Sequence, residues 1–558
     1  MADRASSASI EKADNGGYMH KVKTPHSRTS LEELETQSAG SEYNTLHKGL
    51  QSRHIQLIAL GGCIGTGLFV GTSWTLHNCG AAPLLLSFIL ISTIVYPIMC
   101  SLAEMICYLP QQGSVPELVS RYVDPSLGFA TGWNYAYAYA ILVAAELSAA
   151  ASVVSYWDNP VPMAAWITIF LVVVVGLNFT AVKYYGEAEF WFASIKLICI
   201  LGLLVVSVVI FFGGAPNHDR TGFRYWKNPG PFAMSLAPGS TGRFLDVWRA
   251  VIKSAFAFIL SPELIGIACV EAQDTRRNTE KASRRFIYRI IFFYVSCALM
   301  IGVILSRTDP KLIEALETGA PGAASSPFVQ GIANAGIPVL DHVINVAILS
   351  SAWSAGNSFM YASTRMVLAL AREGNAPKFL TKINRYGVPY NAVIVCTLVA
   401  CLAYLNVKTT SANVFQWLSN ICTISGFIGW FAMGIAFIRF RRGIVFNNLQ
   451  SRIPYQGPLQ PYIAYYFTFM TVVVCLTNGF HVFLKGRWNV VDFVAAYVTL
   501  PIYLVLYLGH KLWFRTRWYI PVEQIDVITG LVEAEEESKM TPPRIPKNLW
   551  EKFLYWLL

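Results

Sequence analysis

The sequence predicts an all-α polytopic membrane protein with about twelve spanning helices, and two observations support this prediction. First, the 558 residues are 54% hydrophobic and only 14% charged, whereas soluble globular chains carry about 25% charged residues. Second, the apolar residues come in runs of roughly 20, which is the length of helix that crosses the hydrocarbon core of a bilayer. A soluble multidomain protein of this length is therefore excluded.

The apolar runs begin only after residue 50, because residues 1–50 are polar and show no cleavable signal peptide. The first span is therefore expected to act as its own insertion signal. Windowed hydropathy places the spans near 55–76, 83–109, 128–157, 162–182, 189–213, 248–270, 287–306, 338–370, 389–406, 414–438, 462–484 and 491–513.

An even number of spans puts both tails on one side, and the distribution of Lys and Arg indicates which side that is. The loops after the first and third spans hold neither residue. The loop after the fifth span is an exception, with Arg220, Arg224, Lys227 and Arg243, but long loops weigh less in this rule. Both tails are predicted to be cytoplasmic, in a plasma-membrane protein. Basic residues cluster after the sixth, eighth and tenth spans: Arg276, Arg277, Lys281, Arg284, Arg285, Arg372, Lys378, Lys382, Arg385, Arg439, Arg441, Arg442 and Arg452.

The spans define a membrane domain at 51–513 between two tails. The N-terminal tail, 1–50, is rich in Ser, Thr, Lys and Glu and is predicted to be disordered. Its lysines and hydroxyls are candidate modification sites, and ubiquitin ligase adaptors are candidate partners of the cytoplasmic tails. The C-terminal tail, 514–558, holds an acidic stretch at 533–537 and an aromatic end at 550–558 that could form an interfacial helix.

The sequence contains no motif for a nucleic-acid, metal or catalytic site. The net charge of +10 is assigned to cytoplasmic loops and anionic lipid, since no nucleic-acid motif is present. The eleven cysteines show no metal-ligand spacing and are interpreted as small core hydrophobes. The sequence shows no nucleophile–base set and no phosphate loop, so we expect neither an enzyme nor a bound cofactor or metal.

The first span carries five glycines between Gly61 and Gly71, in the stretch GGCIGTGLFVG. Glycine weakens a helix, and a broken membrane helix is tolerated only where its freed backbone groups meet a polar cavity or a ligand. The amides of Gly65, Thr66 and Gly67 would then face an anion such as the α-carboxylate of an amino acid. Alternatively, the glycines only allow close packing of helices.

The sixth span has a matching interruption at Ser261-Pro262-Glu263. Proline removes a backbone donor, and the freed carbonyls at 259–262 could accept hydrogen bonds from an ammonium or imino group. Phe256 and Phe258 lie before the break and could gate a cavity. Interrupted helices five spans apart suggest two halves related by inverted repetition, with a substrate site near the middle of the bilayer.

Charged residues inside the spans are few, and each is a candidate functional residue. They are Glu104 in the second span, Glu146 in the third, Lys196 in the fifth, and Lys253 and Glu263 in the sixth. Such groups can load and release a proton, as coupling to a proton gradient requires. The alternative is a structural ion pair or, for Lys253 near its helix end, snorkelling toward the interface.

One aromatic residue of the eighth span, Trp353, lies among small residues in the stretch SSAWSAGN, from Ser350 to Asn357. A helix with small side chains lets a ligand or another backbone come close. Trp353 is therefore a candidate substrate contact, although single aromatic residues are more often part of the core.

At these residues the chain resembles the fungal amino acid permeases of the amino acid–polyamine–organocation superfamily. The resemblance runs from about Gly49 to the C-terminal region and is carried by GGCIGTGLFVGTS, RYVDPSLGFATGWNY, EFWFASIK, FAFILSPELIGIACVEAQDTRRN and SAWSAGNSFMYASTRMVLALAREGNAPKFL. Within the family the chain is most similar to the proline permease branch, through PNHDRTGFRYW, PGAASSPFVQGIANAGI, CTISGFIGW and PVEQIDVITGLVE. The wider family usually has Gly-Thr-Glu where this chain has Ser261-Pro262-Glu263.

The resemblance implies a LeuT-like 5+5 inverted repeat with broken helices one and six, and proton symport of an amino acid across the plasma membrane. It implies carboxylate binding at Gly65–Gly67 and substrate binding or coupling at Glu146. Lys253 and Phe256 match substrate and gating positions of proline carriers. Lys196 matches a lysine whose ammonium takes the place of a sodium ion in related carriers.

The leading hypothesis is therefore a proton-coupled importer of proline or other small neutral amino acids that works by alternating access. The expected partners are the amino acid and membrane lipid, and the driving force is the proton gradient. The alternative hypothesis is a sensor that binds amino acids and signals with little transport.

Overall fold

The computed structural model describes residues 50, 54–55, 57–58, 64–110, 114–157, 160–272, 274–317, 326–337, 339–407, 411–540 and 548. In these residues the regular structure is helical, apart from an isolated bridge between Leu50 and Ala272. The expected disordered tail before Leu50, the glycines at 61 and 62 and the aromatic end at 550–558 lie outside the described residues.

The expected first to sixth spans coincide with helices, and the first and sixth are interrupted. A short helix, α6, precedes the third span. The elements are α3 (Thr66–Phe69) and α4 (Gly71–Cys79), α5 (Ala81–Tyr108), α6 (Val115–Tyr122), α7 (Pro125–Val154), α8 (Met163–Asn178), α9 (Val182–Phe212), α10 (Arg224–Lys227), and α11 (Gly239–Ser254), η1 (Ala255–Phe258) and α12 (Ser261–Val270).

The expected seventh to twelfth spans also coincide with helices. The elements are α13 (Thr275–Arg289), η2 (Ile290–Val295) and α14 (Ser296–Ile304), α15 (Pro310–Glu317), α16 (Pro327–Asn334), α17 (Leu340–Arg372), η4 (Lys378–Thr381), α18 (Tyr390–Ala400) and η5 (Cys401–Val407), α19 (Ser411–Phe446), η6 (Gln450–Arg452), α20 (Tyr462–Leu476), η7 (Phe480–Phe483), α21 (Val490–Tyr497) and α22 (Thr499–Phe514), η8 (Val522–Gln524) and α23 (Leu531–Met540).

Not every expected span is a long apolar helix. Within the described ranges, six helices are long and apolar enough to cross a membrane, and α21–α22, bent by 42°, forms a seventh such span. Three further apolar helices, in the expected spans four, nine and eleven, are shorter. The remaining two expected spans are α3–α4, which is interrupted, and α17, whose many small and polar residues lower its hydropathy. The all-helical membrane fold expected from the sequence is confirmed.

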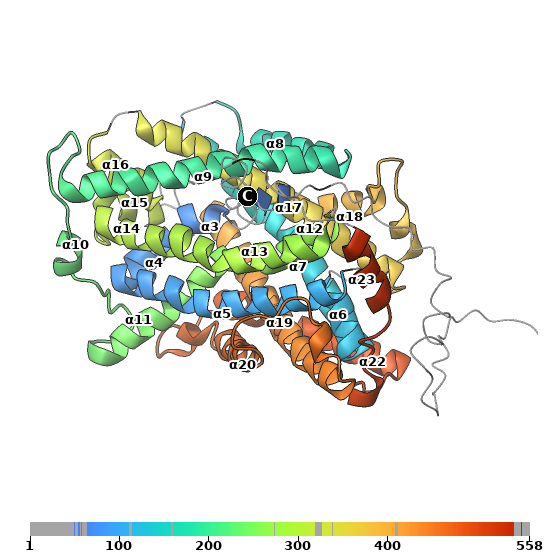
Figure 1. Ribbon diagram of the computed structural model, residues 1–558. Coiled ribbons are helices and arrows are strands. Elements are labelled where there is room, and N and C mark those ends of the chain that lie inside the picture. Colours follow the sequence, from blue (N-terminus) through green and yellow to red (C-terminus); the bar gives the residue numbers. More distant parts are fainter. Residues whose placement is uncertain are drawn as a thin grey trace, which may run out of the picture. The chain divides into compact units, whose positions relative to one another are not determined.

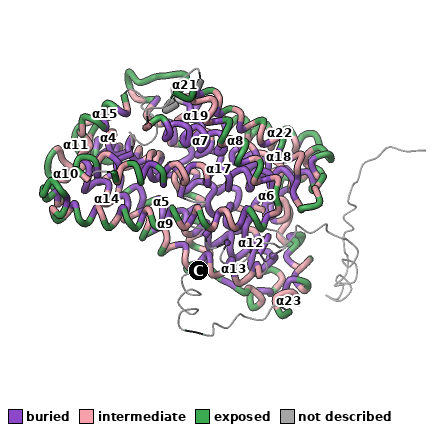
Figure 2. The backbone as a smooth tube through the Cα atoms, turned by 90° about the horizontal axis from the view of Figure 1, so that it is seen from above, coloured by how far each residue is buried: buried purple, intermediate pink, exposed green. Residues whose placement is uncertain are grey.

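Two helices, α7 and α17, pack along each other in the middle of the membrane domain (Figure 1, Figure 2). The apolar part of α7 is 89% buried inside the protein, whereas that of α9 is only 28% buried. A helix with an exposed apolar surface is expected to face lipid, whereas a buried helix can carry the polar groups of a site. The rod formed by α13 and α14 lies beside both α5 and α9 (Figure 1).

Several helices extend beyond the expected spans, and capping residues explain two of these boundaries. The Asp124 side chain accepts a hydrogen bond from the Leu127 amide, so α7 begins at Pro125 instead of 128. Asp274 caps α13 in the same way through the Arg277 amide. The basic residues expected in the loops after the sixth and tenth spans lie largely on such extensions, those of α13 and α19.

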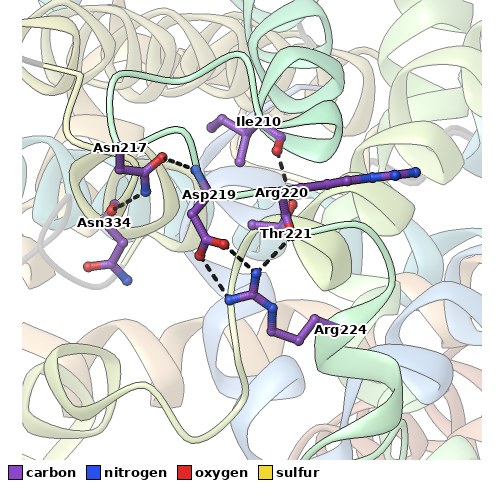
Figure 3. Close-up of polar contacts among 7 residues, drawn as sticks. All are labelled: Ile210, Asn217, Asp219, Arg220, Thr221, Arg224 and Asn334. Atoms are coloured by element: carbon purple, nitrogen blue, oxygen red, sulfur yellow. Dashed lines mark hydrogen bonds and ion pairs between the residues drawn. The ribbon is translucent and has the colours of Figure 1, made fainter.

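The long loop after α9 neutralises part of its own positive charge (Figure 3). Arg224 forms a bidentate pair with Asp219, with N–O distances of 2.8 and 2.5 Å, and donates to the Arg220 carbonyl at 2.8 Å. The hydrogen bond from Arg224 lowers the pKa of Asp219. Asn217 ties the loop to α16 through the Asn334 carbonyl. This pairing gives a physical reason why the loop departs from the expected charge distribution.

The first part of the C-terminal tail packs onto the ends of α5, α6 and α19. Arg121 on α6 donates at 2.7 Å to the carbonyls of Asp526 and Thr529, and it also forms an ion pair with the Asp526 side chain. Tyr108 on α5 donates to the Val527 carbonyl. Val527 and Leu531 are buried, so this part of the tail is held by apolar packing as well as by hydrogen bonds.

The acidic stretch of the tail lies on α23. There, Glu535 forms a bidentate pair with Arg452, with N–O distances of 3.0 and 2.8 Å.

We expect Arg452→Glu to release α23 from this surface, because it places two carboxylates against each other. Arg452 lowers the pKa of Glu535, so the pair stabilises docking above the ordinary pKa of Glu and is lost as the pH falls through the lowered value. Both side chains are partly exposed, which limits the pair to less than about 1 kcal/mol. Limited proteolysis should cut Arg452→Glu faster than wild type between α22 and α23. The swap Arg452→Glu/Glu535→Arg should restore protection, and no gain in cleavage for the single variant would contradict the prediction.

Candidate functional site

The sixth span breaks between η1 and α12. Ile259 is extended, and Leu260 has a φ of 61°, a left-handed conformation that a branched side chain rarely adopts. Such backbone strain costs about 1–3 kcal/mol and persists only where the surrounding structure imposes it. Pro262 follows in the first turn of α12, where its missing N–H leaves no unpaired donor. The break expected at Ser261-Pro262-Glu263 is therefore confirmed, and it begins just before those residues.

One expected acceptor at this break is already occupied. The Leu260 carbonyl accepts a hydrogen bond from the Tyr139 hydroxyl at 2.9 Å and another from the Leu264 amide at 3.1 Å. A carbonyl oxygen has two lone pairs, so this oxygen is not available to an ammonium group. The expectation of freed carbonyls at 259–262 is thus wrong for Leu260.

The first span breaks at Gly65, which precedes the short helix α3, and α3 is separated from α4 by Val70. Gly65 adjoins Glu146, since a Cβ on this glycine would lie 2.7 Å from Glu146 Oε1. The Thr66 hydroxyl donates to the same oxygen at 3.2 Å. On the other side, the Ser351 hydroxyl of α17 donates to the Ile64 carbonyl at 3.0 Å. The break is therefore held by polar groups of α7 and α17.

The two interrupted spans meet directly. A Cβ on Gly67 would lie 3.0 Å from the Ala257 Cα and 3.1 Å from the Phe256 Cδ1. Glycine at this position therefore lets the backbones of spans one and six come into contact. Phe256 in turn packs edge-to-face on Phe415 of α19, with 5.5 Å between ring centroids. The structure thus brings Gly65, Gly67 and Phe256 together.

Lys253 lies one turn before Phe256 and reaches across to α19. Its Nζ donates to Asn420 Oδ1 at 3.0 Å and lies 3.5 Å from Gln416 Oε1. It also lies 5.2 Å from the centre of the Trp74 ring of α4. The ammonium is thus held between α4, α11 and α19 by amide oxygens and an aromatic face, which does not favour snorkelling.

Glu263 follows the sixth-span break and is buried. Its Oε1 accepts a hydrogen bond from the Tyr135 hydroxyl of α7 at 2.9 Å. Gly429 of α19 makes room for that hydroxyl, because a Cβ there would lie 2.2 Å from it. Glu263 therefore belongs to a contact among α7, α12 and α19 that is separate from the contact between Glu146 and the first span.

A second group of buried charges joins α7, α9 and α17. Lys196 is fully buried and interacts electrostatically with the carboxylates of Glu146 and Glu189. Ser354 lies 2.9 and 2.8 Å from the two carboxylate oxygens of Glu189. Glu189 is absent from the sequence-based candidates, because hydropathy places it at the very start of the fifth span. The sequence EFWFASIK could have indicated Glu189, because the seven-residue separation between Glu189 and Lys196 puts both side chains on one face of a helix.

Two other candidates have contacts of a different kind. Trp353 packs edge-to-face on Phe192 of α9, with 4.7 Å between ring centroids, so this contact belongs to the packing of α9 on α17. Its role as a substrate contact stays a prediction. Glu104 lies 2.7 Å from Arg441 of α19 and accepts a hydrogen bond from the Gly457 amide. These contacts favour the structural alternative for Glu104.

The chain is similar over most of its length to known permeases. The chain is 57% identical over 537 residues to a proline-specific permease of Saccharomyces cerevisiae, covering 95% of this chain and 86% of the relative. It is 48% identical to a proline-specific permease of Emericella nidulans, covering 92% and 94% of the two chains. A protein of Schizosaccharomyces pombe named "Probable proline-specific permease put4" is 51% identical, with coverage of 89% and 90%. Residues 54–519 match the profile of the amino acid permease family, and the chain belongs to this family of multi-pass membrane proteins.

Proposed function

We propose that this protein imports proline, together with other small neutral amino acids, across the plasma membrane by proton-coupled alternating access. The observation that carries the proposal is the direct contact between the two interrupted spans at Gly67 and Ala257. Helix interruptions in the same part of a membrane protein provide backbone groups to a ligand, which packing helices do not. The names of the relatives support proline as the substrate.

In this proposal the substrate carboxylate binds the amides of Gly65, Thr66 and Gly67. An amide cluster at the start of a helix attracts an anion, and no side chain of the described residues caps α3. The substrate nitrogen is placed toward the sixth-span break and Phe256, with Glu146 next to the first-span break. Movement of spans one and six against α7 and α17 would then open the site to either side.

The proposed driving force is a proton carried with the amino acid. One charge that crosses 100 mV gains about 2.3 kcal/mol, which concentrates a substrate roughly fifty-fold. Glu146, Lys196 and Glu263 are the proposed coupling groups. All three are buried. Glu146 bonds Thr66 at the first break, Glu263 follows the second break, and Lys196 interacts with Glu146, so their charge states would affect how these helices pack.

The basic clusters on α13, on α19 and after α17 support an orientation with both tails in the cytoplasm. The lipid-facing surface of α9 and its neighbours would contact the plasma membrane. Ubiquitin ligase adaptors are proposed partners of the two tails, where lysines are available in the sequence.

The proposal is tested by uptake of labelled proline in cells with and without the gene, against a panel of competing amino acids. We expect gene-dependent uptake that proline and small neutral amino acids inhibit and that collapses when a protonophore removes the gradient. Proline competing no better than lysine or glutamate would refute the substrate. Undiminished uptake without the gradient would refute the coupling, and equal uptake with and without the gene would favour a sensor.

We expect Lys253→Leu to raise the KM for proline at least about tenfold while the protein still reaches the membrane. The substitution removes the charge-assisted hydrogen bond to Asn420, which fixes α11 against α19 one turn from Phe256, and such bonds contribute about 1.5–3 kcal/mol. Kinetics of labelled proline uptake measure the effect, normalised to surface protein. Arg243→Leu, on the same helix, is the matched control with no expected change. An unchanged KM in Lys253→Leu would contradict a role in the site.

A further inference from the structure

α9 carries a buried carboxylate, Glu189, that has no role in the proposed import. Its side chain is fully buried, and both of its oxygens lie within hydrogen-bond distance of the Ser354 hydroxyl. Ser358 also hydrogen-bonds this carboxylate, but neutral hydroxyls carry no charge to balance it. A buried charge of this kind needs a cation nearby.

That cation is Lys196, two helical turns further along the same face of α9. Lys196 is fully buried and interacts electrostatically with Glu189 on its own helix and with Glu146 on α7. One buried ammonium thus serves two buried carboxylates. When all three groups are ionised, their charges sum to −1.

Hydrogen bonds relate both carboxylates to the first-span break. Glu146 accepts the hydrogen bond from Thr66. Ser354, which contacts Glu189, lies one turn after Ser351 on α17, and Ser351 donates to the Ile64 carbonyl. Glu146 is therefore linked to the break directly, and Glu189 is linked to it through α17.

The other ionisable groups near Glu189 leave this charge balance unchanged. Tyr185, one turn earlier on α9, is neutral and donates to Ser358 of α17. Beyond it, Glu271 and Arg365 form an ion pair of 2.9 Å that is neutral by itself. Among the described residues, the charged groups that interact with Glu189 or with this tyrosine are Lys196 on α9, Glu271 just after α12 and Arg365 on α17.

We propose that Glu189, Lys196 and Glu146 form a charge triad that holds one exchangeable proton, and that Glu189 is the positioning residue that makes the proton necessary. The proposal rests on the proposed proton-coupled import. Without Glu189, the pair of Glu146 and Lys196 is already neutral. The site can then close around this pair and exclude water without binding a proton. With Glu189 present, closure buries a negative charge unless a proton binds.

The proton has a defined place in this scheme. Glu146 Oε2 is buried and has no hydrogen-bond partner in the described part of the chain. A proton from the outer solution converts the Glu146 carboxylate to a carboxylic acid, and the triad becomes neutral as the site closes. When the site opens to the cytoplasm, water stabilises the charged triad and the same proton leaves.

The test separates coupled transport from alternating access. Cells or vesicles that carry Glu189→Gln are compared with wild type for gradient-driven accumulation of labelled proline and for proline–proline exchange without a gradient. We expect the variant to lose accumulation and the dependence of uptake on external pH, and to keep exchange. Accumulation at the wild-type level with an unchanged pH profile would overturn the proposal.

A second variant keeps the test decisive if Glu189→Gln loses all activity. In Glu189→Gln/Lys196→Met only Glu146 remains ionised, so the charge is again −1 and one proton is again needed. We expect the double variant to regain gradient-driven accumulation that the single variant lacks. No gain over the single variant, at equal surface abundance, would overturn the proposal, because a purely structural role predicts greater damage.

Glu187→Gln is the matched control, since it makes the same chemical change on the same helix. Glu187 pairs with His54 and lies outside the triad, so we expect accumulation and its pH profile to stay as in wild type. Loss of coupling in this control would count against the triad. Wild-type protein that neither accumulates nor exchanges proline would refute the proposed substrate instead, and the triad is then tested with the amino acid that the competition panel identifies.

Discussion

Gly67→Ala is expected to lower the rate of proline uptake at least about tenfold, and Gly67→Val to abolish it. The added Cβ would lie 3.0 Å from the Ala257 Cα, so the backbones of spans one and six would have to separate. Backbone cannot rotate away as a flexible side chain can, and overpacking of this kind costs about 1–3 kcal/mol. Initial rates of labelled proline uptake measure the effect.

A second glycine of the same span provides the control. A Cβ on Gly71 would meet no atom of the described residues within 4 Å, so Gly71→Ala is expected to leave uptake unchanged. The two substitutions are chemically identical and only four residues apart. Equal rates for Gly67→Ala and Gly71→Ala would show that close contact of the two breaks is not required for transport.

Arg365→Met is expected to destabilise the protein by about 3–5 kcal/mol, because it leaves the buried Glu271 carboxylate without its cation. Arg365 also stacks on Tyr361 at 4.4 Å, so the substitution removes packing as well as charge. The pair joins Arg365 of α17 to Glu271, the residue after α12. The backbone carbonyl of Glu271 also accepts a hydrogen bond from the Leu50 amide. The measurement is the midpoint of thermal unfolding in detergent, together with surface abundance.

Removing both charges should be far less harmful than removing one. Arg365→Met/Glu271→Leu buries no unpaired charge, and we expect it to recover most of the lost stability. Arg284→Met, at an exposed ion pair with Glu280, should change the midpoint little. A double variant as unstable as Arg365→Met would indicate that Arg365 contributes through packing instead of charge.

The fold was predictable from the sequence to the extent that the bilayer dictates it. Runs of about 20 apolar residues are long enough to span hydrocarbon wherever they pack, so hydropathy located even the spans that are not long apolar helices. The boundaries were less predictable. The start of α11 at Gly239 and the end of α19 at Phe446 lie outside the apolar runs, because helices continue past the hydrocarbon with polar residues that hydropathy excludes.

The candidate site was predictable only where one residue type implies one physical role. The glycines of span one and Pro262 of span six indicated the breaks, because these residues weaken a helix in any context. That Leu260 is strained and that its carbonyl is occupied by Tyr139 depended on α7, which is more than 100 residues away in the chain. Local sequence carries no information about such a partner.

By itself, the sequence determined that this chain lies in a membrane, that spans one and six are interrupted, and which few charges are buried with them. Only the tertiary structure decided how those charges are grouped: Glu104 with Arg441, Glu263 with Tyr135, and Glu146 with Lys196 and Glu189. The physical reason is that the free-energy cost of burying a charge depends on the burial of that charge itself, which an apolar run already indicates. The groups that offset this cost come from other helices and are brought together only by folding.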